Sequence, residues 1–525
     1  MLLSTLHVAG LLLGGNAAPR PSFGRARSLI ASGSAQTAVL SETFGDFPRT
    51  WVPIASTFEL IPDKPTPVRF MEQNYVAFQD NDGEWRVMDD ACPHRLAPLS
   101  EGRIDRDANR IECAYHGWAF EPSSGACARI PQANDAVAAA ATPSARACVA
   151  SYPTRVHKSV LWVWPWEEDC LSVVADERAQ PEGFLAGVSD DAATYTRDLP
   201  YSWDTLLENI VDPAHIPFAH HGLQGKREDA IAINMTNPSS VDAVAVTNGA
   251  TSSGLRGFSF EFGDRTMGKR RAGTGEFRAP FVVAYNADFE PTLDKKGRLK
   301  TSRPFNLTVV CVPTGAGRSR AIIYGGTKPE AKAGEEKAKA GGEEPAKVTP
   351  EMGMKKAPSS IFAKIFKLLP VWLVHVGSNR FLDSDLAFLH YQEQVVQTRG
   401  GDAASRYYMP TPSDRCIVAL RKWIDTHASA GLKQLRPLPP PIYNREELFD
   451  RYTQHTSHCI HCQAALAGLA KWRGNTHLVL AASLLAGVRF LPARVASVFC
   501  IALLRLYAAI ERQLKVGDYK HWQNN

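Results

Sequence analysis

Residues 92–120 constrain the fold more than any other part of the chain, because two pairs of metal-binding side chains lie within this one stretch. The spacing is Cys-x-His followed, after eighteen residues, by Cys-x-x-His. Two thiolates and two imidazoles suit either tetrahedral zinc or a [2Fe–2S] cluster in which two His replace two Cys on one iron. Pro93 and Gly117 lie beside the ligands, where tight loop tips must cover a cluster, and they favour iron. The four ligand candidates are Cys92, His94, Cys113 and His116.

The sequence around these four side chains resembles a Rieske centre. The resemblance includes the flanking segments CPHRLAPLSEG and CAYHGWAF as well as the ligand candidates. Replacing two thiolates by neutral imidazoles raises the potential of a cluster, so a Rieske centre passes single electrons onward. Because such a cluster alone oxidises no substrate, we expect an electron acceptor elsewhere in the chain.

Length and composition limit the remaining possibilities. A chain of 525 residues is too long for one core and corresponds to roughly three or four structural units. The formal charge of +5 is small, and no Lys/Arg stripe is interleaved with aromatic residues, so nucleic-acid binding has no support. Ten cysteines in a chain of this length are not a disulfide framework.

The first part of the chain divides into a leader and a β-rich domain. Residues 1–41 contain no acidic residue and combine Arg with Ser, Ala and Gly, which is typical of an organelle-targeting segment. The leader also begins with a short apolar run followed by small residues, so a single transit peptide and a bipartite signal both stay open. Residues 42–155 contain short β-rich runs between turn residues and predict an antiparallel domain that carries the cluster on two loops. The run VLWVWPW at 160–166 predicts a buried strand.

A second metal site is indicated by the segment PYSWDTLLENIVDPAHIPFAHHG, for which we expect a helix that starts near Ser202. Its polar residues follow the spacing Glu-x3-Asp-x2-His-x4-His. Pro213 and Pro217 break regular helix, so the two histidines need not obey helical spacing to converge. Two imidazoles plus one carboxylate with open positions form the facial triad of non-haem Fe(II) oxygenases. The residues of this spacing are Glu208, Asp212, His215 and His220.

Downstream of the Rieske motif, this segment resembles the catalytic domain of the Rieske non-haem iron oxygenases. The resemblance implies that His215 and His220 are ligands of a mononuclear iron. It also implies that Asp212 bridges the Rieske His of a neighbouring subunit to an iron-ligand His and so provides the electron path. The family pattern places the third ligand at Asp385, seven residues before a Gln, with Asp383 as the near competitor. A helix N-cap is the alternative role for such an aspartate.

Residues 156–445 as a whole are predicted to form the catalytic domain. The runs FVVAYNADFE, FNLTVVCVP and RAIIYGG suggest the antiparallel sheet of a helix-grip domain, against which the helix containing Asp385 would pack. Residues 327–360 are low in hydrophobic side chains and predict a disordered insertion. The predicted fold class is therefore α+β, with an antiparallel β Rieske domain, a helix-grip catalytic domain of sheet and helices, and C-terminal membrane-associated helices.

Residues 446–475 contain a further pair of cysteines. Cys459 and Cys462 have the Cys-x-x-Cys spacing of a dithiol switch or of half a zinc site. Three histidines nearby keep zinc open. They are His455, His458 and His461. The plant pheophorbide a oxygenase-like branch of the Rieske oxygenases carries such a pair in the same place, and this resemblance favours a redox dithiol that is a target of thioredoxin.

Two apolar runs, 478–488 and 495–504, lie in the C-terminal segment 476–525. Each is shorter than the ~20 residues that span a bilayer alone, so a membrane hairpin, an interfacial pair and a buried soluble hairpin all stay open. The branch has two C-terminal membrane segments and an ending similar to VGDYKHWQNN, which favours membrane association. Together with the leader, this implies a plastid location, in the inner envelope or the thylakoid membrane.

The similarity to the chloroplast pheophorbide a oxygenase-like group extends from about Phe47 to the C-terminus, apart from the insertion. This group includes the protochlorophyllide-dependent translocon component and translocon-associated Rieske proteins. The resemblance implies a ferredoxin-dependent, homotrimeric monooxygenase that uses O2 to open the macrocycle of a tetrapyrrole, pheophorbide a. Hydroxylation of protochlorophyllide, chlorophyllide or a phyllobilin side group is the alternative within this class. A chloroplast envelope redox sensor linked to protein import is the alternative that is not an enzyme.

Overall fold

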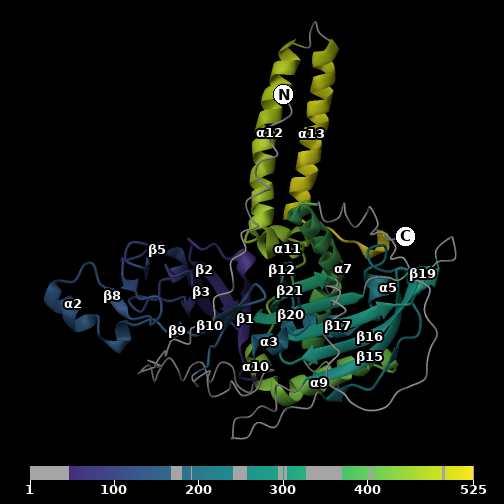
Figure 1. The fold of residues 1–525 in the computed structure, drawn as a ribbon, viewed down its shortest axis with the longest axis horizontal. Coiled ribbons are helices and arrows are strands. Elements are labelled where there is room, and N and C mark those ends of the chain that lie inside the picture. The colour runs from purple at the N-terminus through teal and green to yellow at the C-terminus, as the bar shows by residue number, and fades with distance from the viewer. Residues whose placement is uncertain are drawn as a thin grey trace, which may run out of the picture.

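The computed structural model describes residues 47–166, 180–190, 192–240, 257–293, 299–300, 304–326, 369–400, 406–486 and 491–523. The predicted leader and the predicted insertion both lie outside these described residues. The described elements form two β-rich halves side by side, with a pair of long helices projecting from the larger half (Figure 1).

Three small antiparallel sheets build the N-terminal half. The first has the order β1-β11-β10, with bounds Val52–Ser56, Val160–Val163 and Thr154–His157. The second has the order β2-β3-β4-β9, with bounds Thr66–Phe70, Gln73–Gln79, Trp85–Asp89 and Ser151–Tyr152. The third has the order β5-β6-β7-β8, with bounds Arg103–Asp105, Arg110–Glu112, Ala119–Phe120 and Cys127–Arg129. Every residue of β11 is buried, as its unbroken apolar run predicts.

An 8-stranded antiparallel sheet forms the core of the larger half. Its order is β12-β21-β20-β17-β16-β15-β13, and β14 also pairs with β15. Along β15, the sequence FSFEFGDRT alternates buried residues with more exposed ones, because successive side chains of a strand point to opposite faces. The bounds in sheet order are Thr194–Leu199, Arg318–Gly326, Phe305–Gly315, Val282–Phe289, Lys269–Arg278, Phe258–Thr266 and Asn234–Met235, with β14 at Ser239–Ser240.

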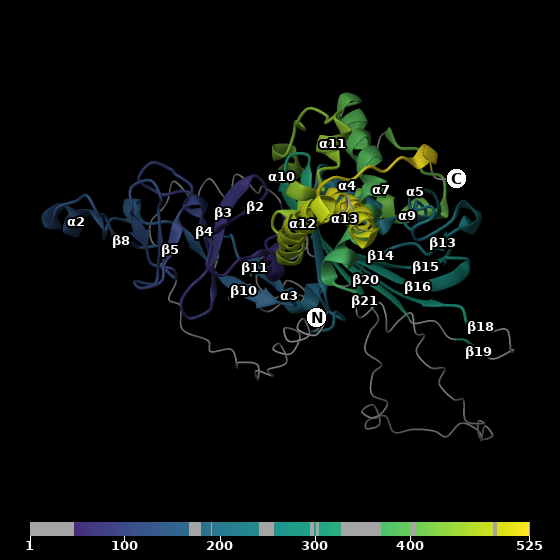
Figure 2. The ribbon, with the colours of Figure 1, turned by 90° about the horizontal axis from the view of Figure 1, so that it is seen from above.

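Helices cover one face of this large sheet (Figure 2). They are α4 (Trp203–Val211), α5 (Ile216–Ala219), α7 (Val371–Thr398) and α9 (Arg415–His427). Helix α4 has Ser202 as its N-cap, as expected, and its apolar side chains Leu206 and Leu207 are fully buried where it contacts β17, β20 and β21. A β-rich N-terminal half and a helix-covered antiparallel sheet confirm the predicted α+β class.

The two C-terminal apolar runs belong to longer helices than the sequence predicts. Helix α12 spans Ile460–Ala486 and α13 spans Leu491–Lys515, and the two lie side by side (Figure 1). The polar stretch KWRGNTH continues α12 as regular helix instead of ending it. Apolar side chains are exposed along the far part of the pair, among them Leu478, Leu485, Val498 and Phe499. Among the described residues, α13 alone has the length and composition of a membrane-crossing helix.

After α13 the chain returns to the larger half. The Gly517 N–H donates to the carbonyl of Phe449 at 2.8 Å, and the Tyr519 hydroxyl lies 3.5 Å from the carbonyl oxygens of Ala219 and His221. A Cβ on Gly517 would lie 2.1 Å from a carboxylate oxygen, so only glycine fits this close approach. The C-terminal tail therefore packs against the loop that carries the paired histidines.

Candidate metal centres

The two predicted cluster loops have the same backbone geometry. In each loop the cysteine N–H donates to the carbonyl five residues later, from Cys92 to Ala97 at 2.8 Å and from Cys113 to Trp118 at 2.9 Å. The residue four positions after each cysteine has positive φ, +59° at Leu96 and +70° at Gly117. Two matching turns thus present one Cys-His pair each, which is the arrangement that a two-iron cluster needs.

The side chains of these loops fit a [2Fe–2S] cluster. Cys92 and Cys113 are buried, while the rings of His94 and His116 lie with their centroids 4.5 Å apart and are partly exposed. The Trp118 ring stacks on His94 with an interplanar angle of 6° and fixes its orientation. Nδ1 of His94 is buried and has no hydrogen-bond partner among the described residues, which leaves it available to a metal. The structure therefore brings all four predicted ligands to one place.

A second group of potential ligands forms where α4 ends. Asp212 follows Val211, the last residue of α4, and His215 and His220 flank the short helix α5. The two imidazoles converge, with Nε2 of His215 3.2 Å from Nε2 of His220. Oδ2 of Asp385 lies 3.4 Å from the same nitrogen of His220. These three side chains could hold one metal ion through two imidazoles and one carboxylate.

The structure separates the two competing aspartates of α7. Asp385 faces His220, whereas Asp383 forms buried ion pairs with Arg197 at 2.7 Å and with Arg451 at 2.6 Å. Neither residue is an N-cap, because both lie inside α7. Asp383 thus neutralises buried arginines, and Asp385 is left to complete the group with the histidines.

Neighbouring side chains orient this group. Ser384 donates to the carbonyl of Phe381 at 2.5 Å, so Nδ1 of His220, 2.6 Å from the same hydroxyl, must be the donor to it. Nε2 of His220 then carries the free lone pair toward Asp385. Burial raises the pKa of Asp385 to about 7, while burial and the adjacent His215 lower the pKa of His220 to about 2. The site therefore holds a neutral imidazole and a carboxyl group that a cation would stabilise in its ionised form.

Asp212 lies beside this group but is not one of the three converging side chains. Its Oδ1 accepts a hydrogen bond from the Ala214 N–H at 2.7 Å, and its Oδ2 lies 3.6 Å from Nδ1 of His215. Glu208, from the same sequence spacing, pairs with Arg421 at a buried position. Figures 1 and 2 place α5 on the opposite side of the molecule from β5 and β8 of the cluster-bearing half.

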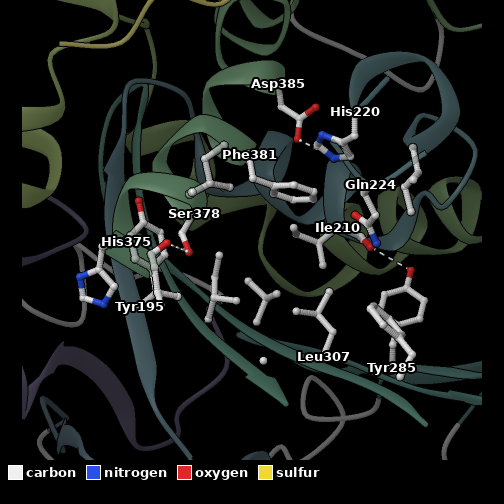
Figure 3. A pocket seen from close by; sticks show the side chains of 18 of the residues that line it. Tyr195, Ile210, His220, Gln224, Tyr285, Leu307, His375, Ser378, Phe381 and Asp385 are labelled. Carbon is white, nitrogen blue, oxygen red and sulfur yellow. Dashed lines mark hydrogen bonds and ion pairs between the residues drawn. The ribbon is translucent and has the colours of Figure 1, made fainter. Parts of the chain in front are cut away.

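A cavity of about 640 Å³ opens onto the His–His–Asp group. Figure 3 shows His220 and Asp385 at one end of this cavity and Tyr195 and His375 at the other. Its lining is mainly apolar and draws on β20, β21 and α7. These residues include Phe305, Leu307, Val309, Ile323, Val371, Leu373, Val374 and Phe381. The volume lies within the range of sites that enclose small molecules, about 300–1,000 Å³.

Arg271 lies in the cavity wall and forms a buried ion pair with Asp264. Its exposed fraction is 3%, its Nε donates to Asp264 at 3.0 Å, and its guanidinium lies 4.4 Å from the ring centroid of Phe305. Nη1 is buried and has no hydrogen-bond partner within the described parts of the chain. An unpaired charged N–H in an apolar cavity is suited to an anionic group of a bound molecule.

Some residues of the site carry no signal in the sequence. Ser384, Asn209 and Arg271 follow no spacing rule relative to the histidines, and the fold brings them in from α7, α4 and β16. For Ser384 the sequence offers no hint beyond its position next to Asp385.

The Cys-x-x-Cys pair lies near the far end of the cavity. Cys459 and Cys462 gather with His455 and, unexpectedly, with His375 of α7. His458 instead faces Glu59, with 3.3 Å between Nε2 and Oε1. Of the three histidines considered near this pair in the sequence, one therefore joins the group of four.

Comparison with known proteins agrees with these features. Residues 50–153 match the family described as Rieske [2Fe-2S] domain, and residues 277–403 match the family described as pheophorbide a oxygenase. The chain is 31% identical to protochlorophyllide-dependent translocon component 52 of Arabidopsis thaliana over 440 residues, which are 78% of this chain and 72% of the relative. It is also 31% identical to pheophorbide a oxygenase of Oryza sativa subsp. japonica over 423 residues, covering 77% and 70% of the two chains.

A solved structure of dicamba monooxygenase bound to dicamba shares the fold, with a TM-score of 0.50 and 14% identity, covering 74% of this chain and 98% of that one. The expected cofactors, a Rieske [2Fe–2S] cluster and a mononuclear non-haem iron, agree with the domain match and with the converging ligand group. Both relatives named above are chloroplastic, in agreement with the expected plastid location. The chain therefore belongs to the Rieske non-haem iron oxygenases, in the branch that contains pheophorbide a oxygenase and the protochlorophyllide-dependent translocon component.

Proposed function

We propose that this oxygenase inserts one oxygen atom of O2 into a chlorophyll-derived tetrapyrrole, with pheophorbide a as the substrate and opening of the macrocycle as the outcome. The similarity to pheophorbide a oxygenase over 77% of the chain supports this choice of substrate class. Reduced ferredoxin is the proposed electron donor, because a plastid Rieske cluster needs a soluble carrier of single electrons.

The observation that carries this proposal is the pairing of an apolar cavity with one buried, unpaired arginine N–H. Pheophorbide a is a broad apolar macrocycle with a single free carboxylate. The apolar walls formed by β20, β21 and α7 suit its ring faces, and Nη1 of Arg271 suits its carboxylate. A macrocycle that fills this cavity would reach the end where His220 and Asp385 lie.

The proposed roles of the residues follow from their positions. Cys92, His94, Cys113 and His116 would hold the [2Fe–2S] cluster, and His215, His220 and Asp385 would hold the iron, which when bound supplies the activation of O2. Ser384 keeps the proton of His220 on Nδ1, and the apolar walls exclude water from the reacting face of the substrate.

Asp212 is the proposed electron bridge between subunits. Because the cluster loops and α5 lie on opposite sides of one chain, we infer that electrons pass between the chains of a homotrimer instead of within one chain. In such an assembly, the exposed faces of His94 and His116 would meet Asp212 of the next chain, whose Oδ2 lies beside His215. The exposed apolar residues of α12 and α13 support association of the protein with a plastid membrane.

A single-turnover reaction tests the proposed function. The protein is reduced under anaerobic conditions and mixed with pheophorbide a, chlorophyllide a or protochlorophyllide a. It is then exposed to labelled O2, and the masses of the pigments are measured by mass spectrometry. We expect one labelled oxygen atom in pheophorbide a. Label in one of the other two pigments would identify that pigment as the substrate instead. Cluster oxidation with no labelled pigment would favour the sensor hypothesis.

A further inference from the structure

The four side chains His375, His455, Cys459 and Cys462 form a buried group that the oxygenase chemistry does not use. They come from three separate elements. His375 lies in α7, His455 lies in the π-helix η9 (Tyr452–Thr456), and the cysteines lie at the start of α12. All four ligand atoms lie within 4.8 Å of one another. We propose that this group is a closed, tetrahedral zinc site that fixes the catalytic helix α7 to the base of the C-terminal helical pair.

The distances match a single four-coordinate ion. Zn–S bonds of about 2.3 Å and Zn–N bonds of about 2.0–2.1 Å require S···N separations of about 3.6 Å and an N···N separation of about 3.3 Å in a tetrahedron. Nδ1 of His375 lies 3.4 Å from Sγ of Cys459 and 3.6 Å from Sγ of Cys462. Nε2 of His455 lies 3.4 Å from Sγ of Cys462 and 3.1 Å from Nδ1 of His375.

Hydrogen bonds alone would hold this group only weakly. Nδ1 of His455 lies 2.6 Å from the carbonyl oxygen of Thr196, so Nδ1 carries the proton of this ring and Nε2 presents a lone pair to the group. Nδ1 of His375 faces that lone pair and both sulfurs, so without a metal the group would depend on one ring proton and two weakly donating thiols. One cation would satisfy all four atoms, and the carbonyl of Thr196 would orient its ligand as backbone carbonyls do at zinc sites.

Charge and burial favour zinc over an accessible dithiol. Two thiolates neutralise a divalent ion, so the occupied site has no net charge in a region where an unpaired charge is costly to bury. The exposed fractions are 3% for Cys459 and 0% for Cys462. A dithiol that exchanges with another protein needs an accessible sulfur. The redox dithiol predicted from the resemblance is therefore the competing hypothesis, and the two make opposite predictions about metal.

The site connects two functional parts of the molecule. His375 and Asp385 lie ten residues apart on α7, which corresponds to about 15 Å along the helix axis. His375 also lines the far end of the cavity. Zinc at this position would fix the N-terminal part of α7, and with it one wall of the cavity, to η9 and α12. Zinc is proposed here in a positioning role and takes no part in the oxidation.

Elemental analysis of the full-length protein tests this proposal and does not depend on the substrate. We expect one zinc and three irons per chain in the wild type. In Cys462→Ser and in His375→Ala, the zinc should be lost, while the visible spectrum of the Rieske cluster stays as a sign of correct folding. Cys500→Ser is the matched control, because Cys500 is a buried cysteine of the same helical pair outside the group, and its zinc content should equal that of the wild type.

Two further results distinguish zinc from the dithiol. Protein produced with cobalt(II) should show a thiolate-to-cobalt absorption band that Cys462→Ser lacks. Alkylation of Cys459 and Cys462 should be slow in the native chain and rise at least tenfold after a strong chelator removes the metal. Wild-type protein without zinc, a fourth iron in its place, or alkylation that the chelator does not change would each overturn the proposal. None of these outcomes would alter the proposed oxygenase function.

Discussion

The Rieske loops and the base of the C-terminal helices each hold two cysteines and two histidines, but they arrange them differently. In the Rieske loops like groups lie together, with the thiols of Cys92 and Cys113 in contact and the rings of His94 and His116 paired toward the surface. In the second group the ligands are interleaved, and Sγ of Cys462 lies 3.4 Å from a histidine nitrogen. A pair of thiols on one side and a pair of imidazoles on the other suit a cluster of two bridged irons. Thiols and imidazoles that alternate around one point suit a single ion.

Ligand types alone therefore do not identify a metal centre. The His–His–Asp group adds a third arrangement, with three ligands and a cavity where a fourth would be. Three protein ligands with an open position are typical of a catalytic metal, and four buried ligands are typical of a structural one. Both of these sites take one ligand from α7, at Asp385 and at His375.

The largest effect is expected from Asp385→Ala. Removing the carboxylate should empty the mononuclear site, reduce product formation more than ~1,000-fold and leave the Rieske spectrum intact. Metal analysis should give two irons per chain. Asp383→Ala is the matched control, because it leaves Arg197 and Arg451 as unpaired buried charges and should lower stability by about 3–5 kcal/mol without removing a ligand. Three irons per chain in Asp385→Ala would indicate that Asp383, and not Asp385, is the iron ligand.

The second prediction compares the two Cys–His sets by the same substitution. His94→Cys should keep a cluster but lower its potential by on the order of 100 mV, which is part of the ~250 mV or more that separates Rieske from all-cysteine clusters. His375→Cys should keep zinc, because three cysteines and one histidine also suit that ion. Redox titration and elemental analysis check both results, and an unchanged potential in His94→Cys would contradict the ligand assignment.

The third prediction concerns stability. Cys462→Ser should lower the free energy of unfolding by at least about 2 kcal/mol, since metal binding contributes directly to folding. For a domain of ordinary size this corresponds to a fall in Tm of roughly 4–8 °C, measurable by calorimetry. Cys500→Ser should change Tm by less. Equal shifts in the two variants would indicate that packing, and not a metal, stabilises the base of the helices.

The smallest expected effect concerns the cavity. Arg271→Gln should raise KM for pheophorbide a about tenfold, because a hydrogen bond to a charged group contributes about 1.5–3 kcal/mol. The methyl ester of pheophorbide a should show little difference between the wild type and the variant. Arg270→Gln is the control, since Arg270 is the exposed neighbour of Arg271 on the same strand. Equal loss with the acid and the ester would argue against a carboxylate contact.

The parts of these sites that could be predicted from the sequence are those with local spacing. The four Rieske residues and the pair His215 and His220 each lie within a short segment, so their spacing alone brings them together. The choice of Asp385 over Asp383 required a family pattern, because the residues that engage Asp383 are far away in the chain. The physical reason for that choice, the pairing of Asp383 with Arg197 and Arg451, becomes visible in the fold.

The place of His375 beside the two cysteines could not be predicted from the sequence. This histidine lies 80 residues before His455 in the chain, within a long helix, and no spacing rule connects it to the cysteines. The histidines beside the cysteines in sequence are better candidates by proximity, yet His458 faces Glu59 instead. The helical pair was likewise predicted too short, because hydropathy marks apolar runs and does not mark the polar turns that extend α12.

The most direct test of the central claim is the yield of labelled pigment per oxidised Rieske cluster in one turnover, measured for the wild type and for Asp385→Ala. The proposed mechanism predicts that oxidation of the wild-type cluster accompanies the appearance of labelled pheophorbide a product. It also predicts that the variant, with its Rieske spectrum intact, gives no labelled pigment. A labelled product from the variant, or cluster oxidation without product in the wild type, would contradict it.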